Sequence, residues 1–516
     1  MKRNRALALL AIAIGAFTIR AEAQDAATQK GLDAITTSAI SAHVGFLASP
    51  LLEGRYTSER GAALASEYIA TMFTHYGVSP AGDRVNGKRG YFQSFDLYRY
   101  SAPTNQRMSI ESAAGTVVPT PDADYLIANR RLTNGFSLAG EVVYVGYGLC
   151  LPELGIDSYG KQDIKGKLVV VLPLTKERLM ASPIAAKGLS NEKISSILNN
   201  QESELTKRKP AAIIYLRTST EIAEKRPHRG PVTSSFDDVM GIPAEAYNAP
   251  ILRVSLSKAM ISSALKQSGV EVDAPLDARF KAVQTRIKIS LSGDITATPL
   301  KDRNVLGMVA GEDTTRCIIV GAHYDHHGMF NGVLYPGADD NASGTAGIMM
   351  LAKALKESGI KPKVNIIFAL WTGEEKGLIG STYYARNPIF PLDRTGMYVN
   401  YDMIGRNAAE DTARLRAHFF FLDKLPRIKE IVEANNAKLG GILRLSNAPT
   451  EGGYWSDHGP FYERNVPFMG WAAGNHPDYH KPTDTADKID PEKIQRITKL
   501  SFLNMLDLAK EFGENR

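Results

Sequence analysis

Residues 317–357 read CIIVGAHYDHHGMFNGVLYPGADDNASGTAGIMMLAKALKE. The apolar run at 317–321 predicts a buried strand, and the amphipathic run at 344–357 predicts a helix. Between them lies a loop rich in His and Asp. Such a strand, loop and helix are typical of α/β proteins, in which polar side chains that follow a strand form a site at the carboxyl edge of the sheet.

The same alternation continues toward the C-terminus. Apolar runs at 364–371 and 397–402 predict further strands, and 378–386 predicts a helix between them. This order favours an α/β fold with parallel strands. Upstream, the spacing of apolar residues predicts two helices within 37–77 and a strand at 91–95.

The region from 121 to 296 has a different pattern. It contains short apolar runs that predict strands, and it lacks clustered His, Asp or Glu. The predicted strands lie at 140–148, 167–172, 211–216 and 251–254, with a polar helix at 187–208. We therefore predict a mostly-β insertion at 121–296 between an N-terminal part, 24–120, and a main part, 297–516, of the other domain.

The N-terminus has the pattern of an export signal. Three basic residues within positions 2–5 precede an apolar run at 6–17 and the A-x-A sequence at 21–23. We interpret 1–23 as a cleaved signal peptide, which predicts a periplasmic or extracellular protein. The apolar run is shorter than the roughly 20 residues of a membrane span, and no later run is long enough, so we expect no stable membrane insertion.

Composition is that of an ordinary folded protein. Of the 516 residues, 44% are hydrophobic and 22% charged, and the net charge is +6. Residues 1–23 carry a net +3, which leaves +3 on the rest and no basic footprint for nucleic acid. Cys150 and Cys317 are the only cysteines. They are able to pair in an oxidising compartment, but two buried free thiols are the preferred interpretation.

Side chains that bind metals follow several predicted strands. They are His323 and Asp325, Asp339 and Asp340 in the next loop, Glu374 and Glu375, Asp402, and His480 near the C-terminus. Each alone is more often a cap, turn or surface residue. Seven of the ten histidines lie after residue 300, however, and the coincidence of these residues within one stretch indicates a site.

The donor types indicate zinc. Two His and three carboxylates suit zinc, whereas the lack of clustered Cys argues against iron–sulfur or structural zinc sites. Five ligands exceed the four of a tetrahedral site and suit two metals that share a carboxylate. Of the adjacent Glu374 and Glu375, one is then free to transfer protons.

The ordered motifs GAHYDHHG, GADDNASG, WTGEEKGLIGS, NYDMIGR, SDHGPF and YHKPTDT resemble the di-zinc aminopeptidase family, metallopeptidase family twenty-eight, which is related to aminopeptidase S and glutamate carboxypeptidase II. FLASPLLEGR and YFQSF resemble its N-terminal stretch. GEVVYVGYG and DIKGKLVVV resemble its inserted protease-associated domain. The resemblance implies a zinc-exopeptidase-like mixed sheet sandwiched by helices, with that mostly-β domain inserted.

The resemblance also assigns roles to residues. It implies that His323 and Asp402 hold one zinc, that Glu375 and His480 hold the other, and that Asp340 bridges them, with Asp339 as the competing bridge. Glu374 is then the general base and Tyr479 stabilises the oxyanion.

Three further residues lie in or near the same motifs. Asp325 and Asp484 are expected to orient His323 and His480. His327, where many members have leucine, is interpreted as a surface residue, with a substrate contact as the alternative.

The expected activity is that of a secreted zinc exopeptidase, an aminopeptidase acting on peptides. A carboxypeptidase, with Arg406 or Arg464 receiving the substrate carboxylate, a dipeptidase, a glutaminyl cyclase and an inactive receptor-like protein are the alternatives. No nucleic-acid partner is expected. The sequence leaves open the preferred side chain and the oligomeric state.

Overall fold

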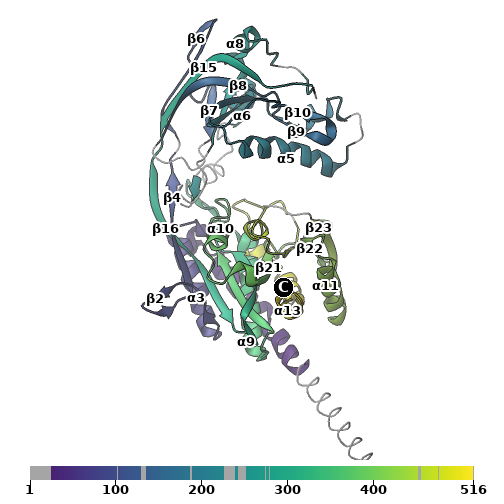
Figure 1. The fold of residues 1–516 in the computed structure, drawn as a ribbon. Coiled ribbons are helices and arrows are strands. Elements are labelled where there is room, and N and C mark those ends of the chain that lie inside the picture. Colours follow the sequence, from purple (N-terminus) through teal and green to yellow (C-terminus); the bar gives the residue numbers. More distant parts are fainter. Residues whose placement is uncertain are drawn as a thin grey trace, which may run out of the picture. The chain divides into compact units, whose positions relative to one another are not determined.

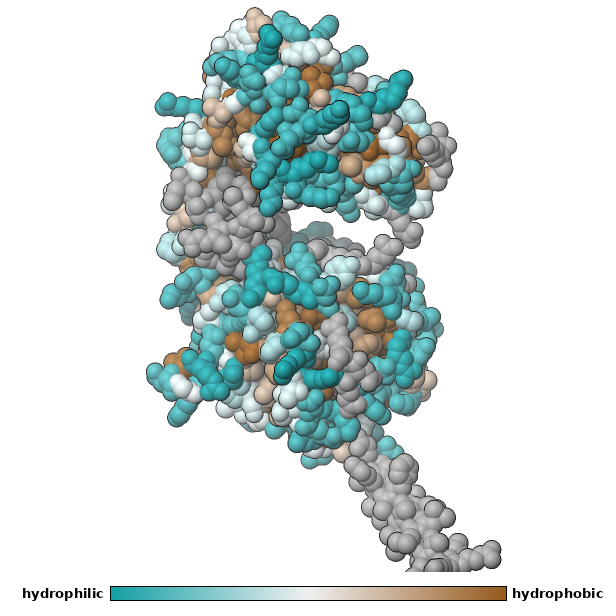
Figure 2. Space-filling model, in the orientation of Figure 1, coloured by the Kyte–Doolittle hydropathy of each residue, from teal (hydrophilic) through white to brown (hydrophobic). Residues whose placement is uncertain are grey.

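The computed structural model describes residues 25–101, 103–128, 135–185, 189–225, 239–241, 251–272, 275–277, 279–450, 455–474 and 476–514. The predicted signal peptide lies outside them. The chain divides into two compact units, Met1–Leu97 with Leu300–Arg516, and Tyr98–Pro299 (Figure 1). Within the described residues, no helix is both long and apolar enough to cross a bilayer. Hydrophilic side chains predominate on the face drawn in Figure 2.

The first unit is built on a mixed sheet, as predicted. The strand order is β4-β16-β20-β17-β21-β24-β22-β23, and β1 pairs with β16. β13, which lies within the range of the second unit, extends this sheet by pairing with Tyr98–Tyr100 at the end of β4. The bounds are β1 Ser79–Pro80, β4 Phe92–Tyr100, β13 Val239–Gly241, β16 Ala297–Val309, β17 Asp313–His323, β20 Val364–Trp371, β21 Thr395–Tyr401, β22 Arg416–Leu422, β23 Arg444–Thr450 and β24 Phe468–Ala472. The four central strands β20, β17, β21 and β24 are parallel. β16 runs antiparallel to β20, and β22 runs antiparallel to β24 but parallel to β23.

Helices cover both faces of this sheet. The helices are α2 Thr37–Leu47, α3 Arg60–His75, α9 Gly344–Ser358, α10 Ile379–Arg386, α11 Pro426–Lys438, α12 Gly459–Tyr462 and α13 Pro491–Glu514. Along β17, Ile318 and Val320 pack with α2, α3, α9, α11 and α13, whereas Cys317 and Ile319 pack with α10 and α12. Because both faces are covered, the central strands are continuous apolar runs, which is why the sequence reveals them.

The second unit has its own sheet and core. Its strand order is β6-β5-β15-β8-β11-β12-β14-β7. The bounds are β5 Thr104–Ser112, β6 Gly115–Val117, β7 Tyr125–Ala128, β8 Phe136–Tyr144, β11 Leu168–Val171, β12 Ala212–Arg217, β14 Leu252–Ser257 and β15 Val283–Asp294, with helices α4 Lys176–Met180, α5 Asn191–Lys207, α6 Ser219–Lys225 and α8 Ser262–Gln267. A short two-stranded ribbon in this unit pairs β9 Cys150–Leu151 with β10 Ile156–Asp157.

The first unit has two such ribbons. They pair β2 Arg84–Val85 with β3 Lys88–Arg89, and β18 Gly328–Phe330 with β19 Val333–Tyr335.

The insertion begins earlier than the sequence predicts. It starts at Tyr98 rather than at residue 121, because β5 and β6 belong to the sheet of the second unit through the pairing of β5 with β15. Both cysteines are free thiols; Cys317 is buried, as predicted, but Cys150 is only half-buried.

A buried arginine joins the N-terminal segment to the rest of the first unit. Arg55 ends the short helix η1 Pro50–Arg55 and is fully buried. Its guanidinium donates to the carbonyl oxygens of Tyr324 at 2.7 Å, Pro336 at 2.7 Å and Gly337 at 2.8 Å, and also to that of Leu47. One side chain therefore fixes the end of α2, the residue after β17 and the loop before α9.

Replacing Arg55 by Met should lower the free energy of unfolding by more than about 3 kcal/mol, since four buried carbonyls lose their donor. The control is Arg60→Met, which removes an exposed ion pair with Glu53 at 2.9 Å that is worth about 0–1 kcal/mol. Urea unfolding of both variants checks this. Equal stability of the two would contradict the role given to Arg55.

The insertion should be removable. Ser101 N donates a hydrogen bond to Thr296 O at 2.9 Å. The segment that enters the insertion and the segment that leaves it therefore lie side by side at this point. Joining these two residues by an Asn-Gly turn, which suits a tight hairpin, should give a soluble protein with the metal content of the full chain, because each unit has its own core. Circular dichroism and elemental analysis check this. A folded, metal-free product would show that the insertion contributes to the site.

Candidate metal centre

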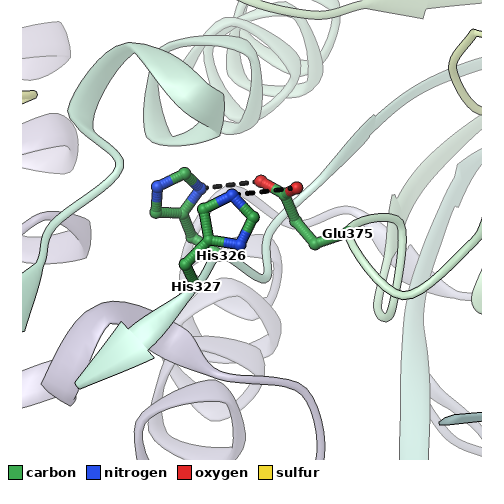
Figure 3. A group of neighbouring side chains, drawn as sticks. All are labelled: His326, His327 and Glu375. Carbon is green, nitrogen blue, oxygen red and sulfur yellow. Dashed lines mark hydrogen bonds and ion pairs between the residues drawn. The ribbon is translucent and has the colours of Figure 1, made fainter. Parts of the chain in front are cut away.

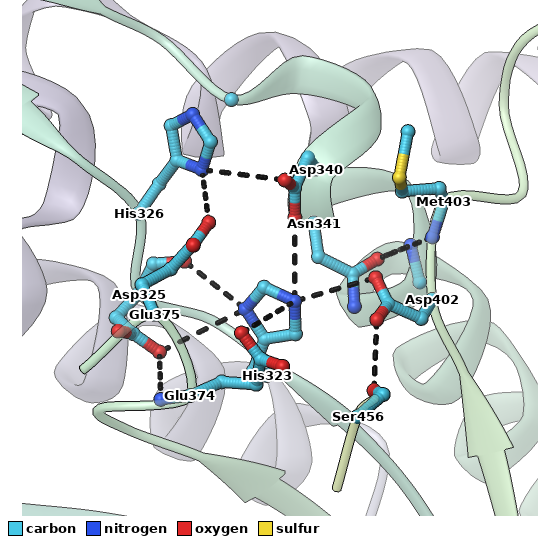
Figure 4. A network of polar contacts seen from close by, with 12 residues as sticks. His323, Asp325, His326, Asp340, Asn341, Glu374, Glu375, Asp402, Met403 and Ser456 are labelled. Carbon is cyan, nitrogen blue, oxygen red and sulfur yellow. Dashed lines mark hydrogen bonds and ion pairs between the residues drawn. The ribbon is translucent and has the colours of Figure 1, made fainter. Parts of the chain in front are cut away.

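The parallel strands bring the predicted ligands to one edge of the sheet. β17 ends at His323, which pairs in register with Trp371 at the end of β20, and β21 ends just before Asp402. Glu374 follows β20 by three residues. Residues distant in sequence therefore meet at the carboxyl edge, as Figure 4 shows.

Hydrogen bonds between side chains and backbone groups fix the conformation of the loop before α9. Asp484 accepts hydrogen bonds from the N–H groups of Asp339 and Asp340, at 3.0–3.1 Å. Asn341 accepts from Gly344 N at 2.9 Å, and its amide donates to Tyr401 O at 2.8 Å. The side chains of this loop are thus held in place by contacts on both sides. Asp484, predicted to orient His480, is seen here to hold the loop.

Asp340 lies between two histidines. Its Oδ1 is 3.3 Å from His323 Nε2, and its Oδ2 is 3.0 Å from His480 Nε2. The neighbouring Asp339 is turned elsewhere, with Oδ1 accepting from Gly405 N at 2.6 Å. The bridging position predicted for Asp340 rather than Asp339 is the one that this geometry suits.

Two groups of ligands share Asp340. In the first, His323 Nε2 is 3.3 Å from Asp402 Oδ1. In the second, His480 Nε2 is 3.6 Å from Glu375 Oε2. Within each group, one donor atom per residue lies within 4.8 Å of the others. The structure therefore brings all five predicted ligands together, in the predicted division.

This donor set fits two zinc ions. Imidazole nitrogens and carboxylate oxygens are zinc ligands, and the shared Asp340 suits a bridge. Burial raises the pKa of Glu375 well above its ordinary value, and the negative charges of Asp340 and Glu374 raise it further. Bound cations would remove this penalty. The residues would thus place one ion between His323, Asp340 and Asp402, and the other between Asp340, Glu375 and His480.

Asp325 holds both a ligand and the predicted base. Its Oδ1 lies 3.7 Å from His323 Nδ1 and accepts from Glu374 N at 3.1 Å, while Thr57 donates to Oδ2 at 2.8 Å. Glu374 Oε2 lies 4.0 Å from His323 Nε2. Burial raises the pKa of Glu374 well above its ordinary value, and Asp402 adds to this. Glu374 is thus a carboxylate with strong affinity for a proton, placed beside the ligands.

The cluster opens to solvent on one side. His323 and Asp340 are buried, but the side chains of Asp402 and His480 are 22% and 26% exposed, and Tyr479 is 43% exposed. The ring of Tyr479 stacks on His480 with centroids 3.7 Å apart. Burial, and then the charge of Asp340, raise the pKa of Tyr479 above its ordinary value, so its hydroxyl stays protonated and able to donate.

The sequence missed several residues around the centre. Ser456 Oγ donates to Asp402 Oδ2 at 2.8 Å, and His476 Nε2 lies 3.2 Å from Asp339 Oδ2. The motif SDHGPF contained the signal for Ser456. The interpretation of His327 as a surface residue is wrong, because it is fully buried beside Glu375.

The two arginines considered for a substrate carboxylate lie differently. Arg406 is engaged with Asp478 at 2.8 Å and lies 3.8 Å from Asp484. Arg464 is exposed, two residues beyond the end of α12. Because Arg406 already forms ion pairs with these carboxylates, it is less able to bind the carboxylate of a substrate. This weakens the carboxypeptidase alternative.

Comparison with known proteins gives the same picture for the main unit. Residues 304–505 match the model of peptidase family M28. The chain is 32% identical over 186 residues to leupeptin-inactivating enzyme 1 of Streptomyces exfoliatus, which covers 36% of this chain and 38% of that protein. It is 30% identical over 202 residues to aminopeptidase YwaD of Bacillus subtilis, which covers 38% of this chain and 41% of that protein. The match thus spans about two fifths of these curated relatives.

A solved structure shares the fold over nearly the whole chain. The aminopeptidase from Aneurinibacillus sp. strain AM-1 superposes with a TM-score of 0.53 at 20% identity, which covers 92% of this chain and 95% of that one. The five predicted ligands all lie within the segment that the family model matches. Over residues 304–505, which the family model matches, the chain is similar to peptidase family M28.

Proposed function

We propose that this protein is a zinc-dependent aminopeptidase that removes N-terminal residues from peptides with a two-metal centre. The observation that carries the proposal is Asp340, whose two carboxylate oxygens face His323 and His480. Each histidine has a further carboxylate beside it, from Asp402 or Glu375. The relatives named aminopeptidases support the reaction class.

In this proposal, different residues carry out different parts of the reaction. Bound zinc supplies Lewis acidity and lowers the pKa of water. Glu374, buried and beside His323, accepts the proton of the attacking water and returns it to the leaving amine. Tyr479 keeps its hydroxyl proton and donates a hydrogen bond to the developing oxyanion. Asp325 keeps Glu374 and His323 in register with each other.

The location and the insertion are part of the proposal. The pattern of residues 1–23 supports export to the periplasm or the medium. The motifs at 140–148 and 163–171 support a protease-associated domain in the second unit. Among the described residues, the groups of side chains that could hold a metal include none from the insertion.

An aminopeptidase should need the free amine of its substrate. Acetylation of the N-terminus should lower kcat/KM by about 10- to 100-fold or more, since a buried acidic site loses a charge-assisted partner. Amidation of the C-terminus should have little effect. Mass spectrometry of the products of matched peptides checks both ends. Dependence on a free C-terminal carboxylate would favour the carboxypeptidase.

The two adjacent glutamates should behave differently. Glu374→Gln should keep the metal content and lower kcat by about 10²- to 10⁴-fold, the usual contribution of a general base. Glu375→Gln, the matched control, should lose one metal, because an amide is a poor zinc ligand. Elemental analysis and steady-state kinetics of both variants test this. Metal loss from the Glu374 variant alone would reverse the assignment.

A further inference from the structure

Two adjacent histidines beyond the five predicted ligands point into the metal centre. His326 and His327 follow Asp325 directly, and both are fully buried. Figure 3 shows their rings directed at the carboxylate of Glu375. One donor atom of each of these three residues lies within 4.8 Å of the others. This is a donor group that the assignment of five ligands leaves unexplained.

The two oxygens of Glu375 face different partners. His326 Nδ1 is 2.8 Å from Oε1. His327 Nε2 is 3.3 Å from Oε2, and His480 Nε2 is 3.6 Å from the same oxygen. The rings of His327 and His480 are perpendicular, with centroids 4.4 Å apart. Two imidazole nitrogens from separate parts of the chain therefore converge on one oxygen.

The histidines differ in what they can do. His326 Nδ1 contacts the other oxygen, Oε1, and lies 3.9 Å from Asp340 Oδ2, so it orients the carboxylate of Glu375, as a hydrogen-bonded partner of a metal ligand commonly does. His327 faces the oxygen that would bind the metal. Burying an imidazole costs free energy unless a polar partner compensates it, and an apolar side chain would fill the same space at lower cost.

We propose that His327 is a further protein ligand of the metal position formed by Asp340, Glu375 and His480. That position then has two imidazoles and two carboxylates, the four ligands of a closed tetrahedral zinc site. The other position, with His323, Asp340 and Asp402, has three protein ligands and keeps an open position for water or substrate. The proposal rests on the metal dependence proposed above and makes the two metal positions unequal.

His327→Leu and His327→Gln separate a ligand from a packing residue. Leucine is apolar, whereas glutamine keeps a hydrogen bond to Glu375 but is a poor zinc ligand. Both variants should bind one zinc as the unmodified chain does and the second more than about 100-fold more weakly, because even changes beside ligands cost about 10- to 100-fold. The control is His418→Leu, a half-buried histidine on β22, which should retain both metals.

The measurement is zinc content at equilibrium in zinc-buffered solutions of the full-length chain, with the visible spectrum of the cobalt-substituted protein as a second readout. Loss of one zinc and a changed cobalt spectrum in both variants would support the proposal. Two zinc ions with unchanged affinity in His327→Gln would overturn it, even if the Leu variant does not fold. An unmodified chain that binds no zinc would instead refute the proposed function itself.

Discussion

Five carboxylates lie together at the carboxyl edge of the first unit's sheet, on Asp325, Asp340, Glu374, Glu375 and Asp402. Burying such charges costs several kcal/mol each unless positive charge compensates them. Arg55 supplies one charge: burial lowers its pKa to about 10, and the nearby Asp325 and Asp340 act against that lowering, so it stays cationic at neutral pH. Two zinc ions would compensate the remaining negative charge. The same carboxylates therefore determine both the stability of this edge of the sheet and its chemistry.

Hydrogen bonds between side chains and backbone groups hold the segments that carry the predicted ligands. Arg55 ties the loop before α9 to β17, Asp484 binds the N–H groups of Asp339 and Asp340, and Asp325 joins His323 to the backbone of Glu374. Such support keeps catalytic groups in place before substrate arrives. Asp339 and Asp340 are adjacent and chemically identical, yet their surroundings differ, since only Asp340 faces both His323 and His480.

Much of this arrangement could be predicted from the sequence because it follows from apolar strands that end in ligands. β17, β20 and β21 are buried on both faces and read as continuous apolar runs, so His323, Glu375 and Asp402 could be placed at one edge. β5 lies before residue 121, and its membership of the insertion depends on its pairing with β15, about 180 residues away in the chain, so the sequence predicts the start of the insertion too late. Arg55 and His327 carry no local pattern; their burial depends on segments more than 40 residues away in the chain.

The central claim is that two metal ions share Asp340. Its most direct test is an anomalous difference map at the zinc edge, from crystals of active protein grown with zinc. The account predicts two peaks per chain, one on the side of His323 and Asp402 and one on the side of Glu375 and His480, with Asp340 touching both. A single peak, or peaks that Asp340 does not contact, in protein that cleaves peptides would contradict it.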